Sequence, residues 1–464
     1  MVWVNRIKAK NTEPEIYGIN GNAGSGAIVL EVSQSKEAWI KNRALTSNLM
    51  EAICSKENLT RSYKKVRANK GSAGIDKMTV DEAGKYLVLN GEKIVSELIN
   101  GTYNPLPVKS VEIPKSNGGV RKLGIPAVID RVIQQAILQV LDPIFDPTFS
   151  DSSYGFRPKR GAQKAVESGA EYVKEGRAIV VDIDLEKFFD KVNHDRLMTS
   201  IGRRIGDKRL LKVIGKFLRA GIMENGICIE RSEGTPQGSP LSPLLSNIVL
   251  DELDKELEKR GHKFCRYADD CNVYVKSLAS GERTMSSITQ FIEKRLKLKV
   301  NQNKSTVAKV EERKFLGYTI RSNGGLSVAK ESIKRFKDKV RTVSNRSRGR
   351  KFESIISELN PIIRGWINYF SKADNKSLAT ELGGWIRRRL RCYKLKQCKK
   401  PSAIARLLIS LNTGKDSAMK IAYSSKGWWV IAQTPQTNRA MSNKWFTENK
   451  LISMLDIWKK LNVN

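Results

Sequence analysis

The spacing of apolar residues predicts helices and a β-hairpin in the first third of the chain. Apolar side chains recur at helical intervals over residues 48–66. Two apolar runs within residues 108–126 flank an Asn-Gly-Gly turn at 117–119, a pattern typical of a β-hairpin. A further helix is expected over residues 130–141, ending before Pro143.

Strands and helices mix irregularly in the middle of the chain. A β-branched run at residues 178–183 predicts a buried strand, and residues 242–260 have the pattern of a long helix. Residues 264–275 are expected to form two strands joined by a tight acidic turn. Helical patterns dominate after about residue 325, whereas the glycine-rich residues 1–42 lack periodicity and are expected to form a flexible extension. Without regular strand–helix alternation, the pattern favours an α+β fold.

The charge of the chain indicates a polyanionic partner. The 464 residues carry a net charge of +35, and such self-repulsion does not help a compact fold. Residues 321–464 hold 31 Lys and Arg against 9 Asp and Glu, a net of +22, whereas the first 320 residues have a net of +13. A solvated basic tail would have this charge too. Tryptophans and tyrosines interleaved with the basic residues favour a folded nucleic-acid surface instead.

Composition also excludes several classes of protein. No stretch of eighteen apolar residues occurs, and the first residues lack the apolar core of a signal peptide. Six cysteines in a chain of this length do not form a disulfide framework, so a reducing cytoplasm is expected. Two histidines and no closely spaced cysteine pair give no support for a zinc ribbon or a His-metal nuclease.

Acidic residues occur in two segments that would lie close together. Asp269 and Asp270 lie in the predicted tight turn, where adjacent carboxylates are costly unless a cation lies between them. Alone, this pattern fits a solvated acidic turn equally well. A second acidic segment, residues 182–190, follows the buried strand, and carboxylate oxygens from both segments would suit Mg²⁺. The Pro- and Gly-rich residues 234–243 lie between them, as either a rigid loop or a substrate contact.

Together these segments resemble the reverse transcriptase family, whose Asp-x₄-Phe, Pro-Gln-Gly and Tyr-x-Asp-Asp motifs they match in order. The resemblance implies an α+β right-hand polymerase. Its fingers and palm would span residues 43–319, after the extension at 1–42. A helical thumb, which is also the maturase domain X, would span 320–400, and a basic DNA-binding region 401–464.

The resemblance also implies roles for individual residues. Asp184, Asp269 and Asp270 would be the catalytic carboxylates that bind two Mg²⁺ ions, with Asp182 in a supporting position. Five residues would contact the incoming dNTP, with Phe189 excluding the 2′-hydroxyl of ribonucleotides: Lys115, Arg121, Phe189, Gln237 and Lys304. The primer grip would be formed by Phe315, Leu316, Gly317 and Tyr318.

Two further segments are similar to the group II intron class of this family. They are Ser153–Arg160 and Ile363–Phe370, the second in the basic last third. An alternative for the second is an amphipathic core helix. The resemblance implies intron RNA binding by seven arginines: Arg157, Arg160, Arg364, Arg387, Arg388, Arg389 and Arg391. Because no two cysteines are separated by a two-residue spacer and no histidine follows His262, the endonuclease-lacking, class C-like type is expected.

The implied function is RNA-directed DNA synthesis combined with a splicing maturase activity, so that the intron is copied into DNA during retrohoming. Expected partners are the group II intron RNA, an RNA template with a DNA primer, target DNA and dNTPs, but no membrane. A homodimer is left open, and the expected location is the bacterial cytoplasm, in association with the nucleoid. The alternatives are a retron- or CRISPR-associated reverse transcriptase and a splicing-only maturase in which the carboxylates would have decayed.

Overall fold

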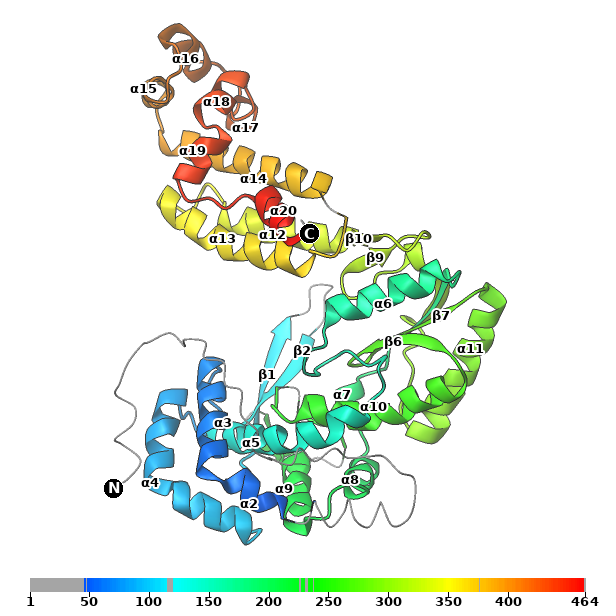
Figure 1. Ribbon diagram of the computed structural model, residues 1–464. Coiled ribbons are helices and arrows are strands. Elements are labelled where there is room, and N and C mark those ends of the chain that lie inside the picture. Colours follow the sequence, from blue (N-terminus) through cyan, green and yellow to red (C-terminus); the bar gives the residue numbers. More distant parts are fainter. Residues whose placement is uncertain are drawn as a thin grey trace, which may run out of the picture.

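The computed structural model describes residue 46 and residues 48–114, 120–224, 227–229, 233–236, 238–374 and 376–462. The extension predicted at residues 1–42 and the turn at 117–119 lie outside these residues. Figure 1 shows a lower body of mixed helices and strands and an upper lobe of helices, with strands β9 and β10 between them.

Helices form the first part of the lower body. They are α2 (Leu49–Cys54), α3 (Lys56–Ala68), α4 (Val80–Ile99) and α5 (Val128–Phe145). The helix predicted over residues 48–66 is divided at Ser55, whose hydroxyl accepts a hydrogen bond from the Asn58 amide and caps α3. The prediction that the next helix ends before Pro143 is wrong. Pro143 lies in the final turn, where its missing N–H removes only the helical bond to the Gln139 carbonyl, and the buried Phe145 anchors that turn in the core.

The predicted hairpin at residues 108–126 is confirmed and belongs to a four-stranded sheet. Its strands are β1 (Val108–Pro114), β2 (Val120–Ile125), β4 (Ile222–Glu224) and β5 (Ile227–Ile229). Strand β1 pairs antiparallel with β2 and parallel with β4, so the sheet order is β2-β1-β4-β5.

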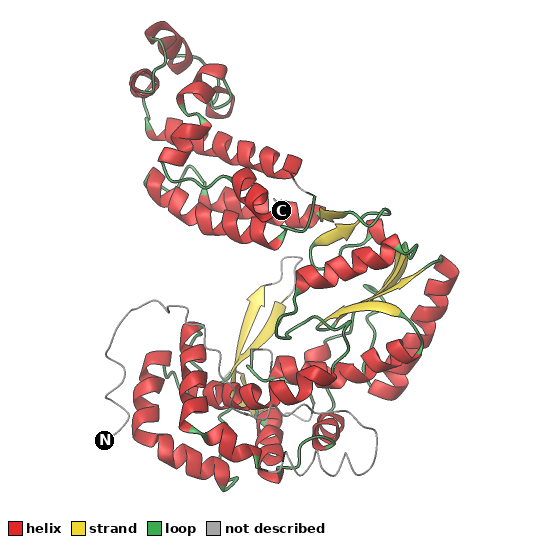
Figure 2. Ribbon diagram, in the orientation of Figure 1, coloured by secondary structure: helices red, strands yellow, loops and turns green. Residues whose placement is uncertain are grey.

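A second, fully antiparallel sheet, here called the central sheet, lies between α6 (Ala162–Lys174) and α11 (Leu278–Phe291) (Figures 1 and 2). Its strands are β3 (Ile179–Ile183), β6 (Lys263–Tyr267), β7 (Asp270–Val275) and β8 (Thr306–Lys309), in the order β6-β7-β3-β8. The buried strand and the strand–turn–strand predicted from sequence are therefore confirmed. Side chains alternate between two hydrophobic clusters: Val181 and Val273 enter one, and Val180 and Tyr274 the other.

Helices and single turns pack around the two sheets. They are α6 (Ala162–Lys174), α7 (Phe188–Lys191), α8 (His194–Gly202), α9 (Lys208–Arg219), α10 (Ser242–Lys259), α11 (Leu278–Phe291), η1 (Asp146–Thr148), η2 (Ile292–Leu296) and η3 (Val310–Glu312). Among them, α6, α10 and α11 contact the central sheet. The long helix predicted at residues 242–260 is confirmed as α10.

The last third is helical after a short strand pair, as the pattern predicts. The strands are β9 (Tyr318–Ile320) and β10 (Leu326–Val328). The helices are α12 (Lys330–Val343), α13 (Phe352–Tyr369), α14 (Lys376–Gln397), α15 (Pro401–Ser410), α16 (Lys415–Ala422), α17 (Trp428–Ile431), α18 (Pro435–Ala440), α19 (Asn443–Glu448) and α20 (Met454–Asn462). One hydrophobic cluster extends from Phe336 to Met454. The domain boundaries proposed from sequence stay a prediction. Among the described residues, no helix is long and apolar enough to cross a membrane.

Candidate active site

The β6–β7 hairpin presents two adjacent carboxylates at the edge of the central sheet. Tyr267 pairs with Asp270, which leaves only Ala268 and Asp269 in the turn. Ala268 has a φ of 56°, a left-handed conformation that such a short hairpin requires but that a residue with a Cβ rarely adopts. The turn therefore places Asp269 and Asp270 beside each other at the end of the sheet.

Asp184 follows the neighbouring strand β3 and is held by a loop before β8. Its amide donates to the Ser305 hydroxyl at 3.0 Å, and its carbonyl accepts from the Asn301 amide at 2.8 Å. The Lys304 ammonium lies 3.2 Å from a carboxylate oxygen of Asp184. This geometry brings the acidic residue and the lysine predicted near the pyrophosphate into direct contact.

Asp182, two residues earlier on β3, is already paired. The Arg313 guanidinium donates to one of its carboxylate oxygens through Nη2 at 2.5 Å and Nε at 3.0 Å. Arg313 also donates to the Lys304 carbonyl at 3.2 Å. Burial raises the pKa of Asp182, and Arg313 opposes that rise. Because Arg313 occupies its carboxylate, Asp182 fits the supporting position expected from sequence.

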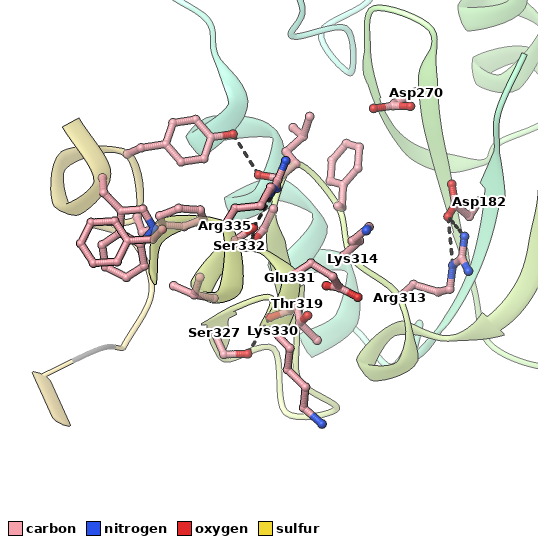
Figure 3. Close-up of a pocket in the computed structure, with 18 of the residues that line it drawn as sticks. Asp182, Asp270, Arg313, Lys314, Thr319, Ser327, Lys330, Glu331, Ser332 and Arg335 are labelled. Carbon is pink, nitrogen blue, oxygen red and sulfur yellow. Dashed lines mark hydrogen bonds and ion pairs between the residues drawn. The ribbon is translucent and has the colours of Figure 1, made fainter. Parts of the chain in front are cut away.

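A cleft of about 1610 Å³ connects these acidic residues with the helical lobe. Asp182 and Asp270 lie at one end (Figure 3), and Asp184 also lines the cleft. Opposite them are residues of α12 and α13, and three exposed cations of the cleft come from α12: Lys330, Arg335 and Lys339. Glu331 of α12 also lines the cleft, but the three cations outnumber it. An acidic end facing this largely basic wall suits a nucleic acid whose terminus reaches the carboxylates.

Electrostatics within the cleft favour a bound cation. The Asp270 side chain is open to solvent on one side, but partial burial and the like charges of Asp269, Asp182 and Asp184 raise its pKa to about 6. Among the described residues, no three His, Cys, Asp or Glu side chains are already close enough to form a metal-binding group. The carboxylate oxygens present here are nevertheless the ligands that a hard cation such as Mg²⁺ prefers. Lys304 compensates only part of their negative charge.

Phe189 lies on the short helix α7 beside this site. It is half-buried, and its ring packs edge-on against the fully buried Phe188 at a centroid distance of 5.3 Å. Its carbonyl accepts from the Thr235 amide at 2.6 Å, which places the Pro-Gln-Gly loop next to it. On the other side of that loop, a Cβ at Gly238 would lie 2.6 Å from the Gly124 carbonyl oxygen on β2. The loop is thus wedged between α7 and the hairpin.

Of the three remaining residues predicted to contact the dNTP, only Arg121 lies among the described residues. Lys115 and Gln237 lie outside the described residues. Arg121 lies on β2 opposite Ile113, but its side chain is not among those described.

The predicted primer grip connects the sheet to the helical lobe. Phe315 and Tyr318 exchange two backbone hydrogen bonds of 2.9 Å, with Leu316 and Gly317 forming the turn at φ values of 52° and 83°. The Tyr369 hydroxyl of α13 donates to the Leu316 carbonyl at 2.9 Å. A Cβ at Gly317 would lie 3.0 Å from the Ser332 hydroxyl and 3.3 Å from the Phe370 ring, so glycine suits this contact.

The predicted RNA-binding arginines differ in their surroundings. Arg364 is exposed on α13, and Arg387, Arg388 and Arg389 are half-buried on α14. Arg160 is bonded to Asp151.

Two of the seven are buried and already bonded. The Arg157 guanidinium bonds Asp146 and the carbonyls of Ser150 and Ser153, and Arg391 donates to the Met441 carbonyl. Such burial favours structural roles for Arg157 and Arg391, because their guanidinium groups are not available to RNA.

Two arginines beside the carboxylates were missed in the sequence. Arg313 holds Asp182, and the fully buried Arg266 precedes the acidic turn and pairs with Asp254 of α10. A charged residue directly after the apolar Phe264 and Cys265 of β6 was a signal for Arg266. No local pattern indicated Arg313.

Comparison with known proteins identifies two family domains in the chain. Residues 113–320 match the reverse transcriptase (RNA-dependent DNA polymerase) family, and residues 333–408 match the group II intron maturase-specific domain. The first match contains the sheet and the acidic hairpin, and the second contains most of α12, α13, α14 and α15. Reverse transcriptase domains use divalent metal ions, and nucleic acids are the partners of both domains.

Two curated relatives span these domains to different extents. Protein YkfC of Escherichia coli is 33% identical over 337 residues, which cover 63% of this chain and 88% of that protein. The group II intron-encoded protein LtrA of Lactococcus lactis subsp. cremoris is 36% identical over 214 residues, which cover 44% of this chain and only 34% of LtrA.

Among solved structures, one chain of a partial Cas6-RT-Cas1--Cas2 complex is similar at 26% identity and a TM-score of 0.35, over 53% of this chain and 42% of that one. With a reverse transcriptase domain followed directly by a maturase domain, the chain belongs to the family of group II intron-encoded reverse transcriptases and maturases.

Proposed function

We propose that this chain copies RNA into DNA at the acidic end of the cleft and also binds its intron RNA as a splicing maturase. One observation carries the proposal: Asp184 and Asp270, from different strand ends, line a single cleft with the basic residues of α12. A template–primer duplex held by that wall would place its 3′ end at the carboxylates. Copying of the intron during retrohoming would follow, with target DNA as a further partner.

Asp184, Asp269 and Asp270 would hold two Mg²⁺ ions. Bound magnesium would activate the primer 3′-hydroxyl and stabilise the leaving pyrophosphate. Lys304, which now bonds Asp184, lies where its ammonium could face that pyrophosphate. Phe189 would exclude the 2′-hydroxyl, and Lys115, Arg121 and Gln237 would contact the rest of the nucleotide.

The same geometry supports the other roles. The turn from Phe315 to Tyr318 would hold the primer, because α13 fixes its Leu316 carbonyl. Arg160, Arg364 and Arg387–Arg389 would contribute to the RNA surface, whereas Arg157 and Arg391 would stabilise the fold. We place this activity in the bacterial cytoplasm, near the nucleoid.

A splicing-only maturase is disfavoured because the carboxylates of both acidic segments are present. A retron-type enzyme is disfavoured because a maturase domain follows the polymerase domain.

The test is DNA synthesis from a DNA primer on an RNA template, measured beside splicing of the intron RNA. Wild-type protein should require Mg²⁺ and dNTPs and should lose synthesis in EDTA. Asp184→Ala should lose synthesis but keep splicing, because most basic residues lie elsewhere. Wild-type protein that splices but never extends a primer would leave the splicing-only maturase as the better account.

A further inference from the structure

The acidic hairpin is braced from behind by one fully buried arginine. Arg266 is the residue before Tyr267 on β6, and its side chain is 1% exposed. Its guanidinium has five N–H donors, and five hydrogen bonds leave it. A buried cation with every donor satisfied is rigid, because any rotation would break several of these bonds.

Two of those bonds pair the positive charge of Arg266 with a buried carboxylate. Nε and Nη2 donate to the two carboxylate oxygens of Asp254 at 2.7 and 2.6 Å, and Asp254 is itself fully buried on α10. This two-pronged pair sets the orientation of the guanidinium plane. Helix α10 therefore serves as the rigid base of the brace.

The other three bonds reach toward the active site. Nη1 donates to the Ala268 carbonyl at 2.9 Å and to the Asn247 side chain at 3.1 Å, and Nη2 donates to the Ser153 hydroxyl at 2.8 Å. Ala268 is the left-handed residue of the turn, directly before Asp269. The arginine thus holds the one peptide whose unusual conformation decides where both carboxylates point.

The segment Ser153–Phe156 closes the brace from the outside. The Tyr154 amide donates to the Arg266 carbonyl, and the Arg266 amide donates to the Ser152 carbonyl, each at 2.8 Å. Asn247 donates to the Gly155 carbonyl at 2.9 Å. A Cβ on Gly155 would lie 2.3 Å from the Ala268 amide nitrogen, so only glycine lets the segment touch the turn.

We propose that Arg266 is a positioning residue for the metal-binding hairpin and that Ser153–Phe156 is the outer half of its brace rather than an RNA-reading segment. The inference rests on the polymerase function proposed above. It assigns a structural role to part of the segment Ser153–Arg160, whose basic residues had suggested RNA binding. Arg266 itself touches no substrate and acts through the Ala268 carbonyl.

The main test replaces Arg266 by lysine, which keeps a positive charge for Asp254 but cannot form the fork. In a folded Arg266→Lys protein, kcat for primer extension should fall about 10- to 100-fold. KM for dNTP and Kd for the template–primer should stay within about twofold, because those contacts lie elsewhere. The affinity of the protein for Mn²⁺ in the absence of nucleic acid, measured by titration, should also decrease.

Arg209→Lys is the matched control. Arg209 pairs with Asp207, whose side chain is 1% exposed, and with Glu51, and α9 and α2 lie far below the hairpin in Figure 1. This variant should lower the melting temperature but leave kcat and Mn²⁺ binding unchanged. An equal loss of kcat in both variants would show that Arg266 matters only for stability.

Gly155→Ala provides a second route to the same hairpin without changing any charge. It should reproduce the loss of kcat and the weaker Mn²⁺ binding of Arg266→Lys. Wild-type kcat and Mn²⁺ affinity in either folded variant would overturn the proposal, as would failure of both variants to fold. Asp269→Asn separates the two claims: if it is inactive while Arg266→Lys is fully active, only the brace is wrong. If it is as active as wild type, the proposed function is wrong.

Discussion

Phe189 shows how one residue can be read as core or as substrate contact. Its neighbour Phe188 is fully buried, whereas Phe189 is half-buried between the core and the Pro-Gln-Gly loop. A half-buried ring beside the acidic cleft can exclude a ribonucleotide by a steric clash with its 2′-hydroxyl. Such exclusion requires no additional attractive contact with the correct dNTP.

Phe189→Ala should therefore raise ribonucleotide incorporation relative to dNTP by at least about tenfold, or about 1.4 kcal/mol in the transition state. Phe188→Ala should instead lose about 3–5 kcal/mol of stability with unchanged discrimination. The measurement is the dNTP/rNTP ratio of kcat/KM for both variants. An unchanged ratio in folded Phe189→Ala protein would contradict the gate and weaken the assignment of Asp184 over Asp182.

At this scale the sequence reveals the proposed metal ligands better than the residues that hold them in place. Asp269 and Asp270 could be predicted because two adjacent carboxylates in a tight turn form a local pattern. The partner of Asp182 could not, because Arg313 lies 131 residues away in sequence and no periodicity relates the two. The same holds for Arg266 and Asn247, 19 residues apart on different elements. Arg157 and Arg391 show the converse, since positive charge alone does not reveal burial.

Among the elements, α5 holds the segment before the β1–β2 hairpin in place through a buried carboxyl group. Asp130 accepts from the Tyr103 hydroxyl at 2.7 Å and from the Leu106 amide at 3.1 Å, which ties the segment before β1 to the helix. Burial raises the pKa of Asp130 to about 7 from an ordinary 3.8, although both hydrogen bonds oppose the rise.

This shift predicts a specific pH dependence of stability. Between about pH 4 and pH 7 the folded state keeps a proton on Asp130 that the unfolded chain has already released. The stability that Asp130 contributes should therefore be lost as pH rises through that window. Asp130→Asn cannot titrate, and its melting temperature should change less between pH 5 and pH 8 than that of the wild type. Equal changes in the two proteins would show that Asp130 is already ionised at pH 5.

The elements themselves were predicted where the pattern was local. The β1–β2 hairpin, β3, α10 and the β6–β7 pair were expected within a residue or two. The continuation of α5 through Pro143 was not, because the buried Phe145 outweighs a local helix-breaking signal.

Considered as a whole, the molecule places an acidic end and a basic wall on one cleft. The wall is formed by Lys330, Arg335 and Lys339 of α12, all exposed. The sequence predicted a basic last third. It did not predict that the basic residues of α12 face the carboxylates, because this arrangement depends on how the helical lobe packs against the rest of the protein.

Replacing these three residues by serine should reduce the salt dependence of template–primer binding. Each lost phosphate contact lowers the slope of log K against log salt by about 0.7–0.9, so the triple change should lower it by about 2–3. The matched control replaces Lys64, Lys85 and Lys93, which are exposed on α3 and α4. Equal slopes for the two triple variants would indicate a generally adhesive basic surface rather than a binding wall.

The most direct test of the whole account is the rate of single-nucleotide addition by Asp269→Asn. The substrate is a DNA primer annealed to RNA with saturating Mg²⁺ and dNTP, and template–primer affinity and melting temperature are measured on the same protein. The account predicts a loss of about a thousandfold or more in rate, about 4 kcal/mol, with affinity and folding retained. Addition at the wild-type rate by folded Asp269→Asn protein would contradict it.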